Sequence, residues 1–367
     1  MFLWQNWRIR AAGLIVILWI GYVLYGSSGQ TAAPTVPLTP PAVPYYATPT
    51  KMDFCGEPVP LNVQDVSERL DREFTIMIHS RAQVYLWLKR VQRYFPAIEK
   101  QLAAAGLPDD LKYVAVAESD LMVNSNSPAG AAGPWQFIAS TGMNYGLQQM
   151  KGIDERYDFE LATASAFRYL RDLYGMFNNW TLAIAAYNCG EKRIQDEVRR
   201  QRIADYYSLK LPNETERYIF RILAIKEILS RAEIYGYSLP RGAGYPPIRG
   251  DRVTVQLPSA VPVQTAAEAA GITYREFRQL NPRLTSDTIP EGAHALKVPE
   301  GRGKDFGARV EALRASAKQN VLYHKVVKGD TVTAIAARYD IDAESLCEWN
   351  QIQEGRIQID HVLKIFK

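Results

Sequence analysis

The chain has 367 residues, a formal net charge of +4 and three cysteines. This length exceeds one typical domain, so we expect two or three domains, each with its own core. The mild charge, without a long Lys or Arg block, argues against a nucleic-acid partner. Cys55, Cys189 and Cys347 lie far apart without metal-ligand or redox spacing, so we expect no metal or other cofactor, and buried free thiols at Cys189 and Cys347.

The amino terminus, residues 1–26, is predicted to be a membrane anchor or a secretory signal. Arg8 and Arg10 precede a continuously apolar run at 11–25. This run is short for a span of about 20 residues, but flanking aromatic residues can extend it. Small residues at 27–29 leave a cleaved signal open. Both alternatives export the chain, which stays tethered to the membrane if the segment is uncleaved and is released if it is cleaved. Cys55 lies too far from the run for lipid attachment.

Composition divides the next part of the chain in two. Residues 27–60 are rich in Pro, Thr and Ala, which predicts an extended linker. Residues 61–240 show apolar spacing of three and four with several glycine stops, which predicts a helical domain that begins near Val63. We expect no strands in it.

An internal repeat organises the remainder. Residues 265–281 align without a gap on residues 334–350, and LKV at 296–298 pairs with LKI at 363–365. A strand-like segment precedes each copy, so we expect two small β-α-α-β modules at 250–300 and 322–367, joined by a linker at 301–321. The predicted protein is multidomain: a mainly α domain followed by two α+β modules.

Glu118 is the first candidate for catalysis. It ends the run VAVAE at 114–118 and shares a helix face with Leu111, Val114 and Ala115. Burial on an apolar face raises the pKa of a carboxyl group and keeps it protonated near neutral pH, as a proton donor requires. A solvated carboxylate at a helix end is the alternative.

The loop after Glu118, SNSPAGAAGPWQF, has the composition of a saccharide cleft. Its small residues allow close approach of chains, Trp135 and Phe137 can form a platform for a sugar face, and Gln136 offers an amide. Alternatively, Trp135 and Phe137 belong to the core.

Five blocks together resemble lytic transglycosylases of the soluble type, which have a lysozyme-like fold. The blocks are Glu118-Ser119, SPAGAAGPWQF at 127–137, DERYDFELATASAFRYL at 154–170, AIAAYNCG at 183–190 and LPNETERYI at 211–219. Residues 323–365 resemble a LysM module, a binder of N-acetylglucosamine polymers, and the middle module resembles a degraded copy. The combination is similar to membrane-bound lytic transglycosylases, and it implies peptidoglycan glycan strands as the partner.

The resemblance also implies roles for individual residues. Glu118 would be the single acid and base that cuts the bond between N-acetylmuramic acid and N-acetylglucosamine, leaving a 1,6-anhydro end without consuming water. Tyr187 would lie beside Glu118. The full substrate-binding set is Ser127, Gln136, Tyr187, Asn188, Glu214 and Tyr218.

Other carboxylates leave alternatives open. Asp120 would point away on a continuing helix, but a turn there would let it position water and make the enzyme a hydrolytic muramidase. Asp154 and Glu155 better suit structural ion pairs. A third hypothesis is a wall-binding scaffold without activity.

In the terminal module, two loops are expected to flank a shallow groove for N-acetyl sugars. The residues concerned are Gly329, Asp330, Thr331, Asn350 and Ile352. Asp330 or Thr331 is expected to cap the helix that follows. The middle module has LPSAVPV in place of this first loop, so we expect weak glycan binding or a spacer role there.

Overall fold

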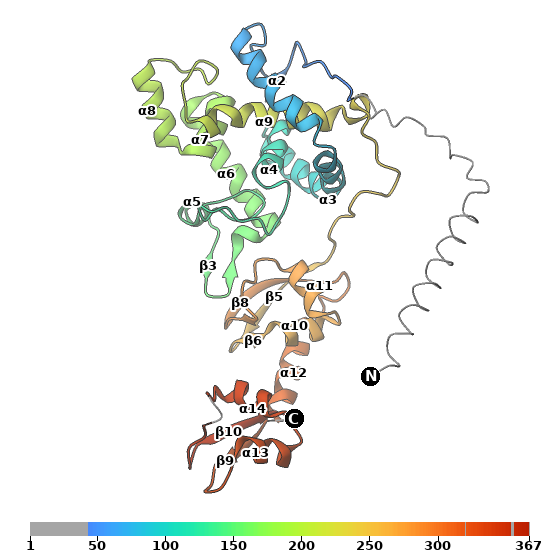
Figure 1. Cartoon of the computed structure of the whole chain (residues 1–367), viewed down its shortest axis with the longest axis vertical. Coiled ribbons are helices and arrows are strands. Elements are labelled where there is room, and N and C mark those ends of the chain that lie inside the picture. Colours follow the sequence, from blue (N-terminus) through green and yellow to red (C-terminus); the bar gives the residue numbers. More distant parts are fainter. Residues whose placement is uncertain (1–42, 320, 354–355, 367) are drawn as a thin grey trace, which may run out of the picture. The chain divides into compact units, whose positions relative to one another are not determined.

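The computed structural model describes residues 43–319, 321–353 and 356–366 (Figure 1). Residues from Ala47 onward form one compact unit. The expected membrane segment at 1–26 lies outside the described residues, as do residues 27–42 of the expected linker. Within the described ranges, no helix combines the length and the apolar character needed to cross a membrane.

The first part of the compact unit is helical, as predicted. Apolar residues at intervals of three and four produce one buried face on most of these helices. The α-helices are α2 (Gln64–Ile78), α3 (Arg81–Ala105), α4 (Lys112–Ser119), α5 (Ala139–Asn144), α6 (Phe159–Phe177), α7 (Trp180–Cys189), α8 (Glu191–Gln201) and α9 (Asn213–Ser230). Three 3₁₀ turns complete the helical set: η1 (Asp109–Leu111), η2 (Glu155–Tyr157) and η3 (Ala232–Tyr235). Helix α3 ends at Gly106, whose positive φ provides the left-handed stop expected of a glycine.

Helix α9 is buried over most of its surface. Its apolar residues face several directions, and it contacts α2, α4 and α7. A helix that is apolar nearly all round is stable only inside a core. Because α9 packs against α4, it brings Tyr218 to the carboxyl end of the helix that carries Glu118.

A short hairpin precedes the helices, where a linker was expected. Strands β1 (Asp53–Phe54) and β2 (Glu57–Pro58) pair antiparallel, and Phe54 is fully buried. The Glu57 carboxylate accepts hydrogen bonds from the backbone N–H of Trp180 and from the amide of Asn179, at 2.7 and 3.1 Å. Glu57 therefore caps α7 from outside, and the linker prediction is wrong for these residues because a contact so distant in sequence leaves no local pattern.

A second hairpin contradicts the expectation of a strand-free domain. Strands β3 (Gln149–Met150) and β4 (Ile153–Asp154) are joined by two residues, with Gly152 at a φ of +83° as a tight turn requires. Strands of two residues are too short to show an alternating pattern in sequence, so no periodicity predicts this hairpin.

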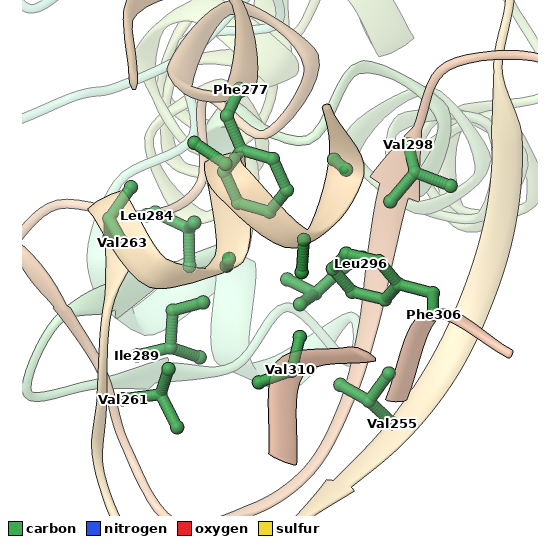
Figure 2. Packing of buried hydrophobic residues seen from close by; sticks show 14 of the residues in the cluster. Val255, Val261, Val263, Phe277, Leu284, Ile289, Leu296, Val298, Phe306 and Val310 are labelled. Carbon is green, nitrogen blue, oxygen red and sulfur yellow. The ribbon is translucent and has the colours of Figure 1, made fainter. Parts of the chain in front are cut away.

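The middle module has the predicted β-α-α-β order, with one further two-residue strand on each side of the helix pair. Its elements are β5 (Asp251–Leu257), β6 (Val261–Pro262), α10 (Val263–Ala270), α11 (Tyr274–Leu280), β7 (Thr288–Ile289) and β8 (Gly292–Val298). Strand β5 pairs with β8 and β6 with β7, both antiparallel. The expected linker at 301–321 is instead largely a helix, α12 (Phe306–Gln319), whose Phe306 and Val310 complete the apolar core of this module (Figure 2).

The terminal module repeats the same order. Its elements are β9 (Val321–Lys325), α13 (Val332–Tyr339), α14 (Ala343–Asn350) and β10 (Val362–Phe366). One asparagine fixes each copy: the amides of Asn281 and Asn350 exchange hydrogen bonds with the backbone of Lys297 and Lys364, respectively, at 2.7–2.8 Å. The sequence repeat is therefore a structural repeat, and the multidomain fold class is as predicted.

Candidate active site

A cleft of about 480 Å³ opens in the helical domain, and Glu118 lines it. The loop at 125–137, α4, α7 and α9 contribute side chains to its walls. The structure brings together here Glu118 and the six residues predicted to hold substrate: Ser127, Gln136, Tyr187, Asn188, Glu214 and Tyr218.

Glu118 occupies the last turn of α4, with a half-buried side chain. Desolvation raises the pKa of Glu118 from an ordinary 4.5 to about 7; the hydrogen bond from Tyr218 and the charge of Arg221 oppose this rise, and the charge of Glu214 adds to it. The Tyr218 hydroxyl donates to Oε1 of Glu118. A carboxyl group with this pKa holds a proton near neutrality and can also release it.

The end of α4 is fixed by two local features. Asp120 adopts a left-handed conformation with φ of +55°, which stops the helix one residue after Ser119. The Ser119 hydroxyl donates to the carbonyl oxygen of Pro134 at 2.8 Å. The helix end and the following loop are thus joined beside Glu118.

The loop at 125–137 folds tightly on itself. Ser127 Oγ accepts from the N–H of Ala131 at 3.0 Å, so its own proton can be directed to a ligand. Gln136 has a φ of +49°, and its amide nitrogen donates to the carbonyls of Ser125 and Gly133. Because the amide nitrogen of Gln136 is used within the loop, its side-chain oxygen is the atom available to accept a hydrogen bond from a ligand in the cleft.

The expected aromatic platform is only partly present. Trp135 is fully buried, and its indole N–H donates to Thr163 at 2.9 Å, so it is a core residue and that expectation is wrong. Phe137 does line the cleft, with Tyr169 and Tyr187 beside it at ring-centroid distances of 6.4 and 6.2 Å. Phe137 is only 2% exposed and Tyr169 8%, so the half-buried Tyr187 is the ring among these three that can offer surface to a sugar face.

The opposite wall comes from α7 and α9. Tyr187 Oη donates to the carbonyl of Trp135 at 2.7 Å, and burial raises the pKa of Tyr187 well above its ordinary value. Asn188 accepts from Thr215 at 2.9 Å. Glu214 is exposed and forms an ion pair with Arg221 at 2.9 Å. The phenol that bonds Glu118 is Tyr218, while Tyr187 orients the loop.

Asp120, the carboxylate considered for water activation, does not line the cleft. Its Oδ1 accepts from the indole N–H of Trp87 at 2.7 Å, and its carbonyl accepts from Arg90 at 3.1 Å. Its side chain therefore stabilises the packing of α3 on the end of α4. Glu191 and Glu214 are the other carboxylates in the cleft.

We predict that Asp120→Asn keeps glycan-cleaving activity within about threefold of the parent. Asparagine tolerates the left-handed conformation and its side-chain oxygen can still accept from Trp87. The measurement is the initial rate of release of soluble products from purified peptidoglycan. A loss of about 10² or more would reinstate Asp120 as a catalytic group.

Three family models and a membrane-bound relative match parts of this chain. The Transglycosylase SLT domain model matches residues 95–209, the LysM domain model residues 324–366, and the model for the LysM-like domain of lytic transglycosylase MltD residues 252–315. Membrane-bound lytic murein transglycosylase D of Escherichia coli strain K12 is 27% identical over 328 residues, covering 85% of this chain and 72% of the relative. These matches support a lytic transglycosylase that combines an SLT domain with two LysM-type domains.

Two solved structures are also similar to this transglycosylase. The 70 kDa soluble lytic transglycosylase from Escherichia coli is 19% identical with a TM-score of 0.35, over 47% of this chain and 30% of that chain. Lytic transglycosylase Slt from Pseudomonas aeruginosa is 18% identical with a TM-score of 0.30, over 42% and 26%. The chain thus spans less than a third of the length of either structure.

Sequence reasoning missed three polar residues of the transglycosylase cleft. Tyr169 donates to Glu191 at 3.1 Å, and Arg221 lies near enough to Glu118 to affect its pKa. The signal for Arg221 was its position three residues after Tyr218 on one helix face. Tyr169 and Glu191 had no such signal, because they meet across α6 and α8. Cys189 is free as expected, but it is half-buried at the cleft wall, and Cys347 is likewise half-buried.

In the terminal LysM module, Gly329, Asp330 and Thr331 lie in the turn before α13, whereas Asn350 ends α14 and Ile352 follows it. Thr331 is the cap of α13, accepting from Ala334 at 3.1 Å, whereas Asp330 accepts from the N–H of Val327 and contacts a ring nitrogen of His324. Asn350 and Ile352 line a separate hollow, and the Asn350 amide is engaged with the backbone of its own module. Gly329 supplies the positive φ of the first turn.

Proposed function

We propose that this lytic transglycosylase cleaves peptidoglycan glycan strands at the β-1,4 bond between N-acetylmuramic acid and N-acetylglucosamine, without water, using Glu118 as its single acid and base. The observation that carries the proposal is a carboxyl group with a pKa of about 7 in a cleft wide enough for sugars, hydrogen-bonded by Tyr218. Ordinary glycosidases need a second carboxylate to attack or to activate water. Here the charged neighbours Glu214 and Arg221 are paired with each other.

In the first step, Glu118 gives its proton to the bridging oxygen as the bond from that oxygen to the anomeric carbon breaks. The carboxylate that forms accepts the hydrogen bond from Tyr218, which stabilises its charge. The acetamido oxygen of the substrate stabilises the positive anomeric carbon from the other face of the sugar. Ser127 and the side-chain oxygen of Gln136 are assigned to hold the sugar and its acetamido group.

In the second step, the C6 hydroxyl of the same N-acetylmuramic acid attacks the anomeric carbon. Glu118 takes the hydroxyl proton and returns to its starting state, so no net proton or water is consumed. The attack is intramolecular, which lowers its entropic cost. The product is a 1,6-anhydro-N-acetylmuramic acid end.

We further propose that the terminal module holds the enzyme on glycan through the loops at 329–331 and 350–352. The protein acts at the periplasmic face of the cell envelope, tethered through residues 1–26 or released after their removal. This placement is supported by the apolar run at 11–25 and by the relative's description as membrane-bound.

Digestion of purified peptidoglycan in ¹⁸O-labelled water tests the reaction. We expect anhydro ends, lighter by one water than reducing ends and free of ¹⁸O, because the attacking oxygen belongs to the substrate. Mass spectrometry of the released fragments makes the measurement. Reducing ends that carry one ¹⁸O would identify a hydrolytic muramidase instead, with Glu191 or Glu214 as its second carboxylate.

A further inference from the structure

The hairpin β3–β4 of the catalytic domain is joined to the middle module by backbone hydrogen bonds. The N–H of Asp154 donates to the carbonyl of Arg283 at 2.8 Å, and the N–H of Thr285 donates to that of Gly152 at 2.9 Å. Ile153 and Leu284 form an antiparallel bridge between these bonds. The hairpin thus pairs with the module as an added strand does, which fixes its register as well as its position.

Side chains close the same contact. Ile153 is 3% exposed and belongs to the apolar core of the middle module, although it lies in the catalytic domain. Gly152 approaches so closely that a methyl group there would lie 2.5 Å from the Ser286 hydroxyl. The contact is therefore packed like a domain interior rather than like a mobile tether.

A buried ion pair lies at the centre of this contact. The Arg283 side chain is 5% exposed and donates through Nη1 to Oε1 of Glu155 at 3.0 Å. The other oxygen of Glu155 accepts from the N–H of Gln148 at 2.9 Å. Because a buried charge needs its partner, the geometry of the hairpin depends on a residue of the middle module.

Arg156, the residue after Glu155, links the hairpin to the loop that lines the cleft. Arg156 is held by Asp154 through contacts of 2.7–3.2 Å. Its Nη1 donates to the carbonyls of Gly130 and Phe137 at 2.8 and 2.9 Å. Both carbonyls belong to the loop at 125–137, which carries Ser127 and Gln136 into the cleft.

We propose that the middle module braces the catalytic cleft and that Arg283 is a positioning residue for substrate binding, acting through Glu155 and Arg156 on the loop at 125–137. This inference rests on the proposed function for its substrate. It replaces the expected roles of weak glycan binder or spacer for this module. Glu118 is held instead by α4 and by Tyr218 of α9, which Arg283 does not contact.

Because the loop at 125–137 and Glu118 are held by different residues, the proposal predicts a specific kinetic signature. Loosening the loop at 125–137 weakens its contacts with the sugar, so KM rises. The position and pKa of Glu118 do not change, so kcat and the basic limb of the pH profile stay as in the parent. A loss of folded protein would instead lower kcat with KM unchanged. The two effects are therefore distinguishable.

The experiment uses the full chain and soluble, uncrosslinked glycan strands. We expect Arg283→Gln and Glu155→Gln each to raise KM about tenfold with kcat within about threefold of the parent. The double variant should be no worse than either single one, since both break the same pair. Arg283→Lys should recover part of the affinity. Arg314→Gln is the control, because Arg314 pairs with Glu311 inside the middle module, and it should leave KM unchanged.

Hydrogen exchange followed by mass spectrometry gives a readout that needs no activity. Peptides covering 125–137 should exchange at least about tenfold faster in Arg283→Gln, while those of α9 should match the parent. Three results would contradict the proposal: an unchanged exchange rate at 125–137 in Arg283→Gln, an equal increase of this rate in Arg314→Gln, or a fall in kcat without a rise in KM. If the parent enzyme releases reducing ends, the proposed reaction is wrong, but the ratios of KM and of exchange rate between variant and parent still test the role of Arg283.

Discussion

Glu118→Gln should lower the rate of glycan-strand cleavage at least about 10³-fold, because glutamine cannot give a proton to the bridging oxygen or take one from the C6 hydroxyl. In the parent enzyme the rate should fall about tenfold per pH unit above pH 7, as the acid with a pKa of about 7 ionises. Release of soluble fragments from peptidoglycan, measured between pH 5 and 9, gives both results. The inactive-scaffold hypothesis predicts instead that parent and variant behave alike.

Glu118→Gln should also be more stable than the parent at alkaline pH. Folding raises the pKa of Glu118, so the folded protein binds this proton more tightly than the unfolded chain does. The resulting stabilisation is complete below about pH 4.5 and is lost as pH rises through about 7. Glutamine does not ionise, so Glu118→Gln should exceed the parent in free energy of unfolding by at most about 3 kcal/mol at pH 8 and by little at pH 5.

A matched surface variant controls both measurements. Glu68 is exposed on α2 and accepts a hydrogen bond from Gln64 on the same helix, so Glu68→Gln should change neither activity nor the pH dependence of stability. Urea unfolding at the two pH values measures the difference. A stability gap between Glu118→Gln and the parent that does not grow with pH would contradict the raised pKa.

Gly133→Ala should lower the free energy of unfolding by about 2–4 kcal/mol and activity by about 10² or more. The added methyl group would lie 1.8 Å from the carbonyl oxygen of Arg156, and φ at this position is +82°. The backbone of Arg156 cannot move aside as a flexible side chain can, so the loop at 125–137 must move away from Arg156. Ser127 and Gln136 would move with it.

Gly130→Ala is the control within the same loop. Its φ is +79°, but no atom lies within 4 Å of the added methyl group. It should cost only about 1 kcal/mol, for the left-handed conformation, and keep activity within about threefold. Urea unfolding and initial rates compare the two variants. Equal effects would show that conformation, and not the contact with Arg156, explains the role of Gly133.

Much of the fold was accessible from local sequence. Apolar spacing predicted the helices, and the glycine after α3 predicted its stop at Gly106. The repeat at 265–281 and 334–350 predicted two modules of one kind, which the shared bonds of Asn281 and Asn350 confirm. Where elements were two residues long, as in β3 and β4, there was no period to detect.

The sequence by itself identified Glu118 and six further residues that line the cleft, because they stand in ordered blocks on helices and a loop, but it did not identify Tyr169, Glu191 or Arg221. Only the tertiary structure decided what each does there: Tyr218 bonds Glu118, Trp87 turns Asp120 away, and Trp135 is core. The bond between Tyr218 and Glu118 joins residues 100 positions apart. Desolvation and hydrogen bonding depend on atoms brought together by packing, and that proximity has no trace in the order of neighbouring residues.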